Sequence, residues 1–248
     1  MAKLFVGTSG YTYSHWENDV FYPKNLPKTK QLEYYSTHFA TVEMNYPFYR
    51  LPSIESFKKW KEKTPKDFVF ALKVSRVITH IRRLHQSKKE WKTFLERALY
   101  LEEKLGPFLF QLPPSFKKDP KRLQEFIKMI KETNSKHRFV LEFRHPSWFS
   151  KEIFRILKKE KNVSLCLADS PKWPQVLEIT GDFVYIRMHG GKILYSSDYS
   201  KEEELKIWAT RIKKWLKNDL DVYVYFNNDA YGYAIKNTKT LLKLISSS

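Results

Sequence analysis

Polar and charged residues recur where short apolar runs of this chain end. Two of them, Glu43 and Glu142, are carboxylic acids that can act as general acid and base if their environments separate their pKa values. His189 and Asp169 occupy the same kind of position, and the imidazole of His189 is a third group that can carry a proton. We therefore predict Glu43, Glu142, His189 and Asp169 as the catalytic residues.

A second set of residues at these positions suits an anion. Lys73, Arg144 and Arg187 are cations, and arginine offers a planar fork that pairs with phosphate or carboxylate. Gly190 opens a glycine pair of the kind that binds phosphate through loop amides in many barrels. The predicted substrate-binding residues are Lys73, Arg144, Arg187, Asn45, Gln111, Tyr11, Gly190 and Asn227.

Two other interpretations use the same residues. Glu43, Glu142, Asp169 and His189 are an oxygen-rich set that suits Mg²⁺, Mn²⁺ or Zn²⁺, but no HExxH or similar local spacing supports a metal site. We assign no metal ligand, the sequence does not identify a cofactor, and a divalent metal is the lesser alternative. The side chains can also form a purely structural ionic network, for instance Glu43 with Lys73 and Glu142 with Arg187. Burying so many charges for stability alone is seldom favourable, which counts against that interpretation for the whole set.

The apolar runs that carry these residues predict eight strands. Within a strand, residues two apart share a face, so Glu142 with Arg144 and Arg187 with His189 point the same way. The same spacing joins Glu43 to Asn45. The predicted strands are Leu4–Thr8, Thr41–Met44, Phe68–Val74, Phe108–Leu112, Phe139–Phe143, Val163–Ala168, Phe183–Met188 and Val222–Phe226.

Helical patterns separate the strands. Ser53 and Ser150 are expected to begin helices, and Ser200 with Glu203 is a capping box for a helix that ends near Lys217. A weaker segment, Trp173–Glu178, follows the sixth strand. The other expected helices are Lys28–Phe39, Lys88–Leu105 ended by Gly106-Pro107, Pro120–Glu132 and Ala234–Ile245.

Eight strands alternating with about eight helices predict a single (β/α)₈ TIM-type barrel, over residues 1–248, with its site at the carboxyl ends of the strands. A doubly wound sheet is the competitor, but no strand opens into a GxGxxG or GxxxxGK[ST] loop. The loop Gly10–Pro27 is long and aromatic, and we expect it to pack over the barrel mouth with one or two rings left for the substrate.

Eight segments of the chain resemble the successive signature segments of the YecE-like family, a domain of unknown function numbered seventy-two. The resemblance spans essentially the whole chain and implies a TIM-type barrel without an established reaction. The segments are GTSGYTYSHW, VEMNYPFYRLP, FALKVSRVITH, FLFQLPPSF, LEFRHPSWF, LCLADSP, VYIRMHG and VYVYFNNDAYGYA.

Composition limits the class of protein and its partners. The formal net charge is +18 and the sequence pI is about 9.7, which favours anionic partners. There is one cysteine, Cys166, so no intrachain disulfide can form. The N-terminus shows no signal-peptide pattern and no apolar run is long enough for a membrane helix, so we expect a cytoplasmic protein with no membrane partner. The sequence does not indicate an oligomeric state.

These observations favour an enzyme, of hydrolase or isomerase type, that acts on an anionic or phosphorylated small molecule by acid–base chemistry. The alternative is a nucleic-acid-binding protein or nuclease, whose phosphate contacts would come from the basic segment 76–92.

Overall fold

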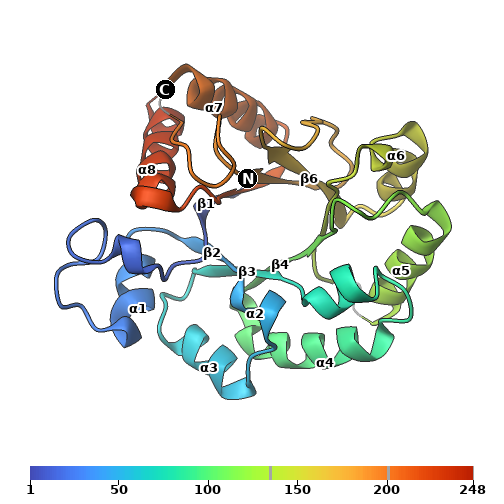
Figure 1. Cartoon of the computed structure of the whole chain (residues 1–248), viewed down its shortest axis with the longest axis horizontal. Helices are drawn as coiled ribbons and strands as arrows, with labels where there is room; N and C mark the ends of the chain where they lie inside the picture. The colour runs from blue at the N-terminus through green and yellow to red at the C-terminus, as the bar shows by residue number, and fades with distance from the viewer. Residues whose placement is uncertain (134–135, 200–201, 248) are drawn as a thin grey trace.

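Eight parallel strands close into one barrel in the computed structural model, which describes residues 1–133, 136–199 and 202–247 (Figure 1). Each strand pairs with the next along the chain, and the last pairs with the first. The predicted (β/α)₈ TIM-type fold is confirmed. Its strands are β1 (Leu4–Ser9), β2 (Thr41–Met44), β3 (Val69–Lys73), β4 (Leu105–Gln111), β5 (Phe139–Glu142), β6 (Val163–Asp169), β7 (Phe183–Met188) and β8 (Asp221–Phe226).

The interior of the barrel is filled by alternate side chains of the strands. Val140 and Tyr185 belong to this inner cluster and are fully buried. Two residues further along their strands, Glu142 and Arg187 therefore point inward at the carboxyl end. The strand period thus places polar groups directly above an apolar interior.

Helices surround the ring of strands and bury one apolar face each (Figure 1). In α5, Leu123, Phe126, Ile127 and Ile130 are spaced three and four apart and buried, as expected of a helix packed on a sheet. The helices are α1 (Gln31–Ser36), α2 (Tyr46–Tyr49), α3 (Ile54–Glu62), α4 (Lys88–Ala98), α5 (Pro120–Thr133), α6 (Lys151–Lys158), α7 (Glu202–Lys217) and α8 (Tyr233–Ser246). Shorter helical turns are η1 (Ser14–Trp16), η2 (Lys28–Lys30), η3 (Val77–Ile81), η4 (Leu99–Lys104), η5 (Pro146–Trp148) and η6 (Ala230–Gly232).

Two expected helices differ from the prediction. The segment Lys88–Leu105 is divided into α4 and the 3₁₀ helix η4, and Gly106-Pro107 lies inside β4 instead of ending a helix. Glycine is needed at position 106 because a Cβ there would lie 2.6 Å from Cγ1 of Val69 on the neighbouring strand. The helix predicted for Lys28–Phe39 is η2 followed by α1, which ends at Ser36.

The connection between β6 and β7 contains no helix in residues 170–182, all of which are described. Pro171 and Pro174 account for the irregular backbone around Trp173, because proline restricts both its own backbone and that of the preceding residue. The weak segment Trp173–Glu178 is therefore not a helix. Two helices, α2 and α3, follow β2, so the described residues still contain about as many helices as strands. The capping box predicted at Ser200 lies outside the described residues.

The long loop after β1 packs as a compact cover. Trp16, Phe21 and Tyr22 are buried, and Nε1 of Trp16 donates to the backbone oxygen of Asp229 over 2.9 Å, which ties the loop to the end of β8. Tyr11 at the start of the loop is partly exposed. Among the described helices, none is long and apolar enough to cross a membrane. The cytoplasmic location stays a prediction.

Candidate active site

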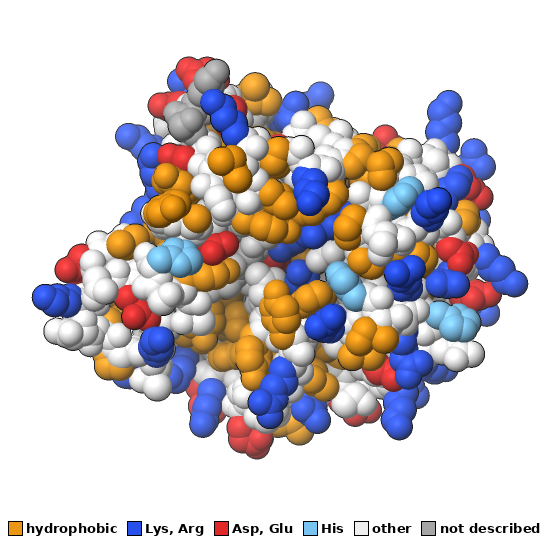
Figure 2. Space-filling model, in the orientation of Figure 1, with side chains coloured by type: hydrophobic (Ala, Val, Ile, Leu, Met, Phe, Trp, Pro, Cys, Tyr) orange, Lys and Arg blue, Asp and Glu red, His pale blue; other side chains and the backbone are white. Residues whose placement is uncertain are grey.

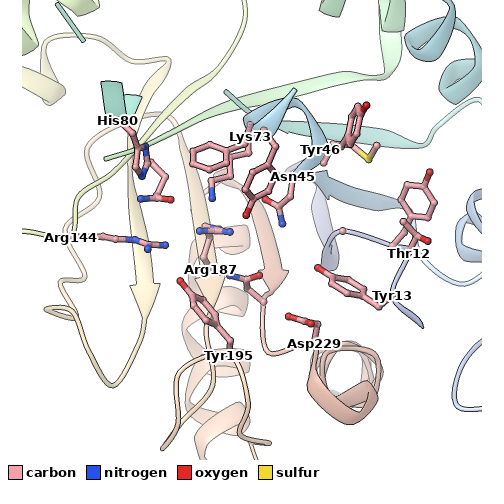
Figure 3. Close-up of a pocket in the computed structure, with 17 residues that line it drawn as sticks. Thr12, Tyr13, Asn45, Tyr46, Lys73, His80, Arg144, Arg187, Tyr195 and Asp229 are labelled. Atoms are coloured by element: carbon pink, nitrogen blue, oxygen red, sulfur yellow. The ribbon is translucent and has the colours of Figure 1, made fainter. Parts of the chain in front are cut away.

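A cavity of about 620 Å³ opens at the carboxyl ends of the strands (Figure 3). Basic side chains lie in the hollow at the middle of this face, and hydrophobic side chains surround it (Figure 2). The barrel thus brings together residues that are far apart in the sequence. The predicted site residues that line the cavity are Tyr11, Asn45, Lys73, Gln111, Arg144, Arg187 and Asn227.

Arg187 lies at the floor of the cavity between the two predicted glutamates. Its Nη1 donates to Oε2 of Glu142 over 2.6 Å, and its Nη2 donates to Oε1 of Glu43 over 2.8 Å. Glu43 also accepts hydrogen bonds from the hydroxyls of Ser9 and Tyr185. Both oxygens of Glu43 are therefore occupied by donors from two other strands, β1 and β7.

Glu142 is held as a carboxylate. Its Oε1 accepts from Nε of Arg144 over 2.7 Å, and its other oxygen pairs with Arg187. Burial alone would raise the pKa of Glu142, but the guanidinium of Arg187 and then that of Arg144 hold this pKa well below its usual range. A group with so low a pKa is a poor proton carrier near neutral pH. The geometry makes Glu142 an organiser of the two arginines and not a favourable acid or base.

Lys73 is a cavity-lining cation without a carboxylate partner among the described residues. Its side chain is 9% exposed, and Nζ lies 4.1 Å from the centre of the Phe48 ring. The pair of Glu43 with Lys73, given above as an example of a structural network, is wrong, because the ion-pair partner of Glu43 is Arg187. Burial and the charge of Arg187, with a smaller effect of Arg144, lower the pKa of Lys73 to about 7. Near neutral pH a large fraction of this side chain is therefore an uncharged amine.

Arg144 is anchored on two sides. Its Nε donates to Glu142, and its guanidinium carbon lies 3.8 Å from the centre of the Trp173 ring. The side chain is 10% exposed and lines the cavity, and its terminal nitrogens have no protein acceptor within the described part of the chain. A fixed arginine fork with free N–H groups is a site for a carboxylate or a phosphate.

His189 lies below the cavity and is fully buried. Nδ2 of Asn227 lies 3.1 Å from its Nδ1, and its Nε2 lies 3.9 Å from Oε1 of Glu142. Burial and the charge of Arg187 hold the pKa of His189 well below its usual range, so the ring is neutral. The ring therefore orients Asn227, which does line the cavity, and is not exposed to a substrate.

The structure does not bring Asp169 or Gly190 to the cavity. Asp169 is one residue out of phase with Cys166, which faces the barrel interior, so its carboxylate points to α7 and accepts from Nε1 of Trp208 over 2.9 Å. The amide of Gly190 donates to the hydroxyl of Tyr199 over 3.2 Å. Gly190 is therefore not free to bind phosphate, and Asp169 is not placed to act on a substrate.

Ten further residues line the cavity, and four of them, each from the segment after a different strand (β1, β3, β7 and β8), carry polar or ionisable groups: Tyr13, His80, Tyr195 and Asp229. Asp229 stands two residues after Asn227, so the spacing used for the other strand ends could have identified it. Burial raises the pKa of Asp229, and burial followed by the charge of Lys73 lowers the pKa of His80 to about 4. No sequence pattern indicated Tyr195, which comes from the loop between β7 and α7.

The alternative metal set does not assemble. Within residues 1–133, 136–199 and 202–247, no three His, Cys, Asp or Glu side chains are grouped so that they could hold a metal ion. Glu43 and Glu142 are separated by the guanidinium of Arg187, and Asp169 points out of the barrel.

Residues 5–248 match the family described as "Protein of unknown function DUF72". The chain belongs to the DUF72 family. The UPF0759 protein YunF of Bacillus subtilis (strain 168) is 29% identical, over 98% of this chain and 94% of YunF. The UPF0759 protein YecE of Escherichia coli (strain K12) is 27% identical, over 74% of each chain. The predicted resemblance to the YecE-like family is therefore confirmed.

Solved structures of the DUF72 family have the same fold. The crystal structure of a DUF72 family protein from Thermotoga maritima MSB8 matches with a TM-score of 0.86 at 29% identity, over 99% of this chain and all of that one. A DUF72 family protein from Enterococcus faecalis V583 matches with a TM-score of 0.83 at 20% identity, over 99% and 96% of the two chains. Neither the DUF72 family nor these relatives have an established reaction, so the chemistry of the site has to be argued from its residues.

Proposed function

We propose that this DUF72 protein is an enzyme that acts on an anionic small molecule by acid–base chemistry in the cavity at the barrel mouth. The observation that carries the proposal is Lys73, a buried cavity-lining cation without a carboxylate partner among the described residues. The two carboxylates of the floor, Glu43 and Glu142, are balanced by the two guanidinium groups of Arg144 and Arg187. Protonated Lys73 therefore carries a positive charge that the floor does not balance and that has no ion-pair partner among the described residues, so a carboxylate or phosphate of a ligand can pair with it.

The roles of the residues follow from their surroundings. Arg144 binds the anionic group, because its terminal nitrogens are free and its plane is fixed against Trp173. Lys73 transfers protons, because its pKa of about 7 lies near the operating pH of a cytoplasmic enzyme. Asp229 lines the same cavity and, with a pKa raised by burial, is the second proton carrier (Figure 3).

This assignment changes the roles first predicted for the strand ends. Glu43 and Glu142 hold Arg187 and Arg144 in place, and His189 orients Asn227. Hydrolysis and isomerisation both need a proton donor and a proton acceptor on either side of the reacting bond, which Lys73 and Asp229 supply from opposite walls. The rings of Tyr13, Phe48 and Tyr195 line the same cavity and give it an aromatic wall.

A binding experiment with a matched control tests the anion site. Titration calorimetry with inorganic phosphate and small carboxylates is done on the wild type, Arg144→Met and Arg122→Met. Arg122 is a suitable control because it also pairs with a carboxylate, Asp119 at 3.1 Å, and lies over an aromatic ring, that of Phe116, outside the cavity. We expect binding to fall about tenfold or more in Arg144→Met, the loss of one charge-assisted bidentate contact, and to persist in Arg122→Met. Equal affinity in all three proteins would contradict the proposal.

Turnover is tested next, with the compounds that bind. Conversion of such a compound that disappears in Lys73→Met, while binding remains, supports the acid–base role. If Lys73→Met still converts the compound, Lys73 is not the acid–base group and another residue transfers the proton.

A second candidate function, nucleic-acid binding or cleavage, is favoured by one observation. The segment that places His80 in the cavity also carries exposed Arg76, Arg82 and Arg83. Phosphate contacts from these side chains would give oligonucleotide binding that falls steeply with salt. Fluorescence anisotropy with short oligonucleotides, for the wild type and for a variant with all three arginines changed to serine, measures this. Absence of binding at low salt removes this candidate.

A further inference from the structure

We infer that Lys73 is a nucleophile that forms an imine with the carbonyl group of its substrate, and that the substrate is a small aldehyde or ketone bearing a carboxylate or phosphate. The inference rests on the proposed function, since it uses the same cavity and the same anion site at Arg144. It adds a covalent step and a substrate class.

The first support is the position of the amine. Lys73 is the last residue of β3 and pairs in register with Leu109 of β4, so its backbone is fixed by the barrel. Its side chain reaches the cavity wall beside Asn45 and across from Arg144 and Arg187 (Figure 3). A reactive group on a strand end is held more precisely than one on a loop.

The second support is a comparison with another buried lysine of the same chain. Nζ of Lys104, a residue that is 5% exposed, donates to the backbone oxygens of Lys61 and Thr64, both over 2.6 Å, and to the Thr64 hydroxyl over 3.1 Å. This is how a structural buried ammonium is satisfied. Nζ of Lys73 has no such acceptor among the described residues and lies over the face of Phe48. The N–H groups on Nζ of Lys73 are therefore available to form hydrogen bonds with a ligand.

The third support is the electrostatic surroundings, because only an uncharged amine attacks a carbonyl carbon. Two guanidinium groups face Lys73, and burial together with the charge of Arg187 lowers its pKa from 10.5 to about 7. At pH 7 the uncharged fraction is then on the order of a thousandfold larger than for an ordinary lysine. Desolvation and a neighbouring cation are the means by which lysine nucleophiles are activated.

The same site suits the product of the step. The lone pair of Nζ attacks the carbonyl carbon and a C–N bond forms. The carbonyl oxygen takes up the two amine protons and leaves as water when its remaining bond to carbon breaks. One amine and one carbonyl compound give one imine and one water, with no oxidant or reductant.

A protonated imine is a cation, and the carboxylates of Glu142 and Glu43 favour the charged form of a group at Lys73. Asp229 on the opposite wall is then placed to take a proton from the carbon next to the imine.

Reductive trapping tests the inference without any need for turnover. The wild-type protein is incubated at pH 7 with sodium cyanoborohydride and one of three probes: pyruvate, glyceraldehyde 3-phosphate or acetone. Peptide mass spectrometry then locates the secondary amine, whose mass increment is that of the probe less one oxygen atom. Lys239 is the internal reference, because its Nζ also lies over a phenylalanine ring, at 5.7 Å from the centre of Phe21, but the side chain is exposed outside the cavity.

We expect Lys73 to be labelled at least about tenfold faster than Lys239 by the two anionic probes, and to show a smaller preference with uncharged acetone, which gains from the uncharged amine but not from the anion site. The anionic probe with the larger ratio of Lys73 to Lys239 labelling identifies the anionic group of the substrate, because this ratio cancels the different reactivities of an aldehyde and a ketone. Lys73→Arg, which keeps the charge but cannot form an imine, abolishes the fast label, and Lys239→Arg leaves it unchanged.

Labelling of wild-type Lys73 no faster than Lys239 overturns the inference, and this comparison needs no variant to fold. If phosphate binding still depends on Arg144 in that case, the proposed function stands without a covalent step. If phosphate does not bind either, both fall.

Discussion

The guanidinium of Arg187 and the carboxylate of Glu142 form an ion pair of 2.6 Å in which neither side chain is more than 1% exposed. The pair joins β7 to β5 across the barrel floor, and Glu43 of β2 pairs with the same guanidinium at 2.8 Å. Removing one member of such a group leaves the other as an uncompensated buried charge, which is costly. The floor is therefore a rigid platform below Lys73 and Arg144, the groups that face the cavity.

Glu142→Gln keeps the shape of the side chain but removes its charge. We expect the free energy of unfolding to fall by about 3 to 5 kcal/mol, measured by urea denaturation. The control is Glu152→Gln, whose carboxylate is 53% exposed and pairs with Lys118 at 3.1 Å, and for which the expected change is less than about 1 kcal/mol. Similar losses of unfolding free energy in the two variants would show that the buried ion pairs of Glu142 stabilise the protein no more than an exposed ion pair does.

The stability of the protein should depend on pH through Lys73. Because its folded-state pKa, about 7, lies below the value of 10.5 expected when unfolded, the unfolded chain binds more protons between these limits. The contribution of Lys73 to the free energy of unfolding therefore rises with pH above about 7, by at most about 1.4 kcal/mol per pH unit. Urea denaturation at pH values from 6 to about 9 measures it.

Replacing Lys73 by Met removes this dependence. The difference in unfolding free energy between the wild type and Lys73→Met is expected to be constant below pH about 7 and to increase above it. Lys239→Met is the control, and its slope with pH should match that of the wild type. A difference between wild type and Lys73→Met that does not vary with pH would contradict the lowered pKa.

Arg144→Lys keeps a positive charge at the anion site but loses the planar fork. Lysine cannot pair with Glu142, lie flat on Trp173 and present two further N–H groups at once. We expect the affinity for inorganic phosphate to fall about tenfold in titration calorimetry, the equivalent of about 1.4 kcal/mol. Arg122→Lys, outside the cavity, should bind phosphate as the wild type does. Full affinity in Arg144→Lys would mean that charge alone holds the anion.

Gly7→Ala should destabilise the barrel. A Cβ at this position of β1 would lie 2.2 Å from the backbone oxygen of Thr41 on β2, and backbone atoms of a closed sheet cannot move aside cheaply. Overpacking of this kind costs about 1 to 3 kcal/mol, which lowers the Tm by several degrees in a thermal melt. In Gly191→Ala the nearest atom would be the flexible carboxylate of Glu204 at 3.2 Å, so little change is expected. An unchanged Tm in Gly7→Ala would mean that β1 and β2 are not so tightly packed.

The sequence by itself determined the barrel and the end of it that carries the site. Apolar runs of about five residues, most of them followed by polar residues and a helix, are local patterns that can be recognised without knowing any long-range contact. The spacing of two also placed Arg187 with His189 on one face correctly. Asp169 was chosen only because it follows an apolar run, and counting by twos from Cys166, which faces the barrel interior, places it on the outer face.

Only the tertiary structure decided which of these polar groups face a substrate. Arg187 pairs with Glu142 and Glu43, which lie 45 and 144 positions earlier in the chain. Strand register and barrel closure bring these partners to Arg187, and no local sequence pattern predicts them. The pairing uses up Glu43 and Glu142, which the sequence predicted as acid and base, and it leaves Lys73 without a carboxylate among the described residues. The chemical role of a buried ionisable group is set by the charges around it, and here those charges come from other strands of the barrel.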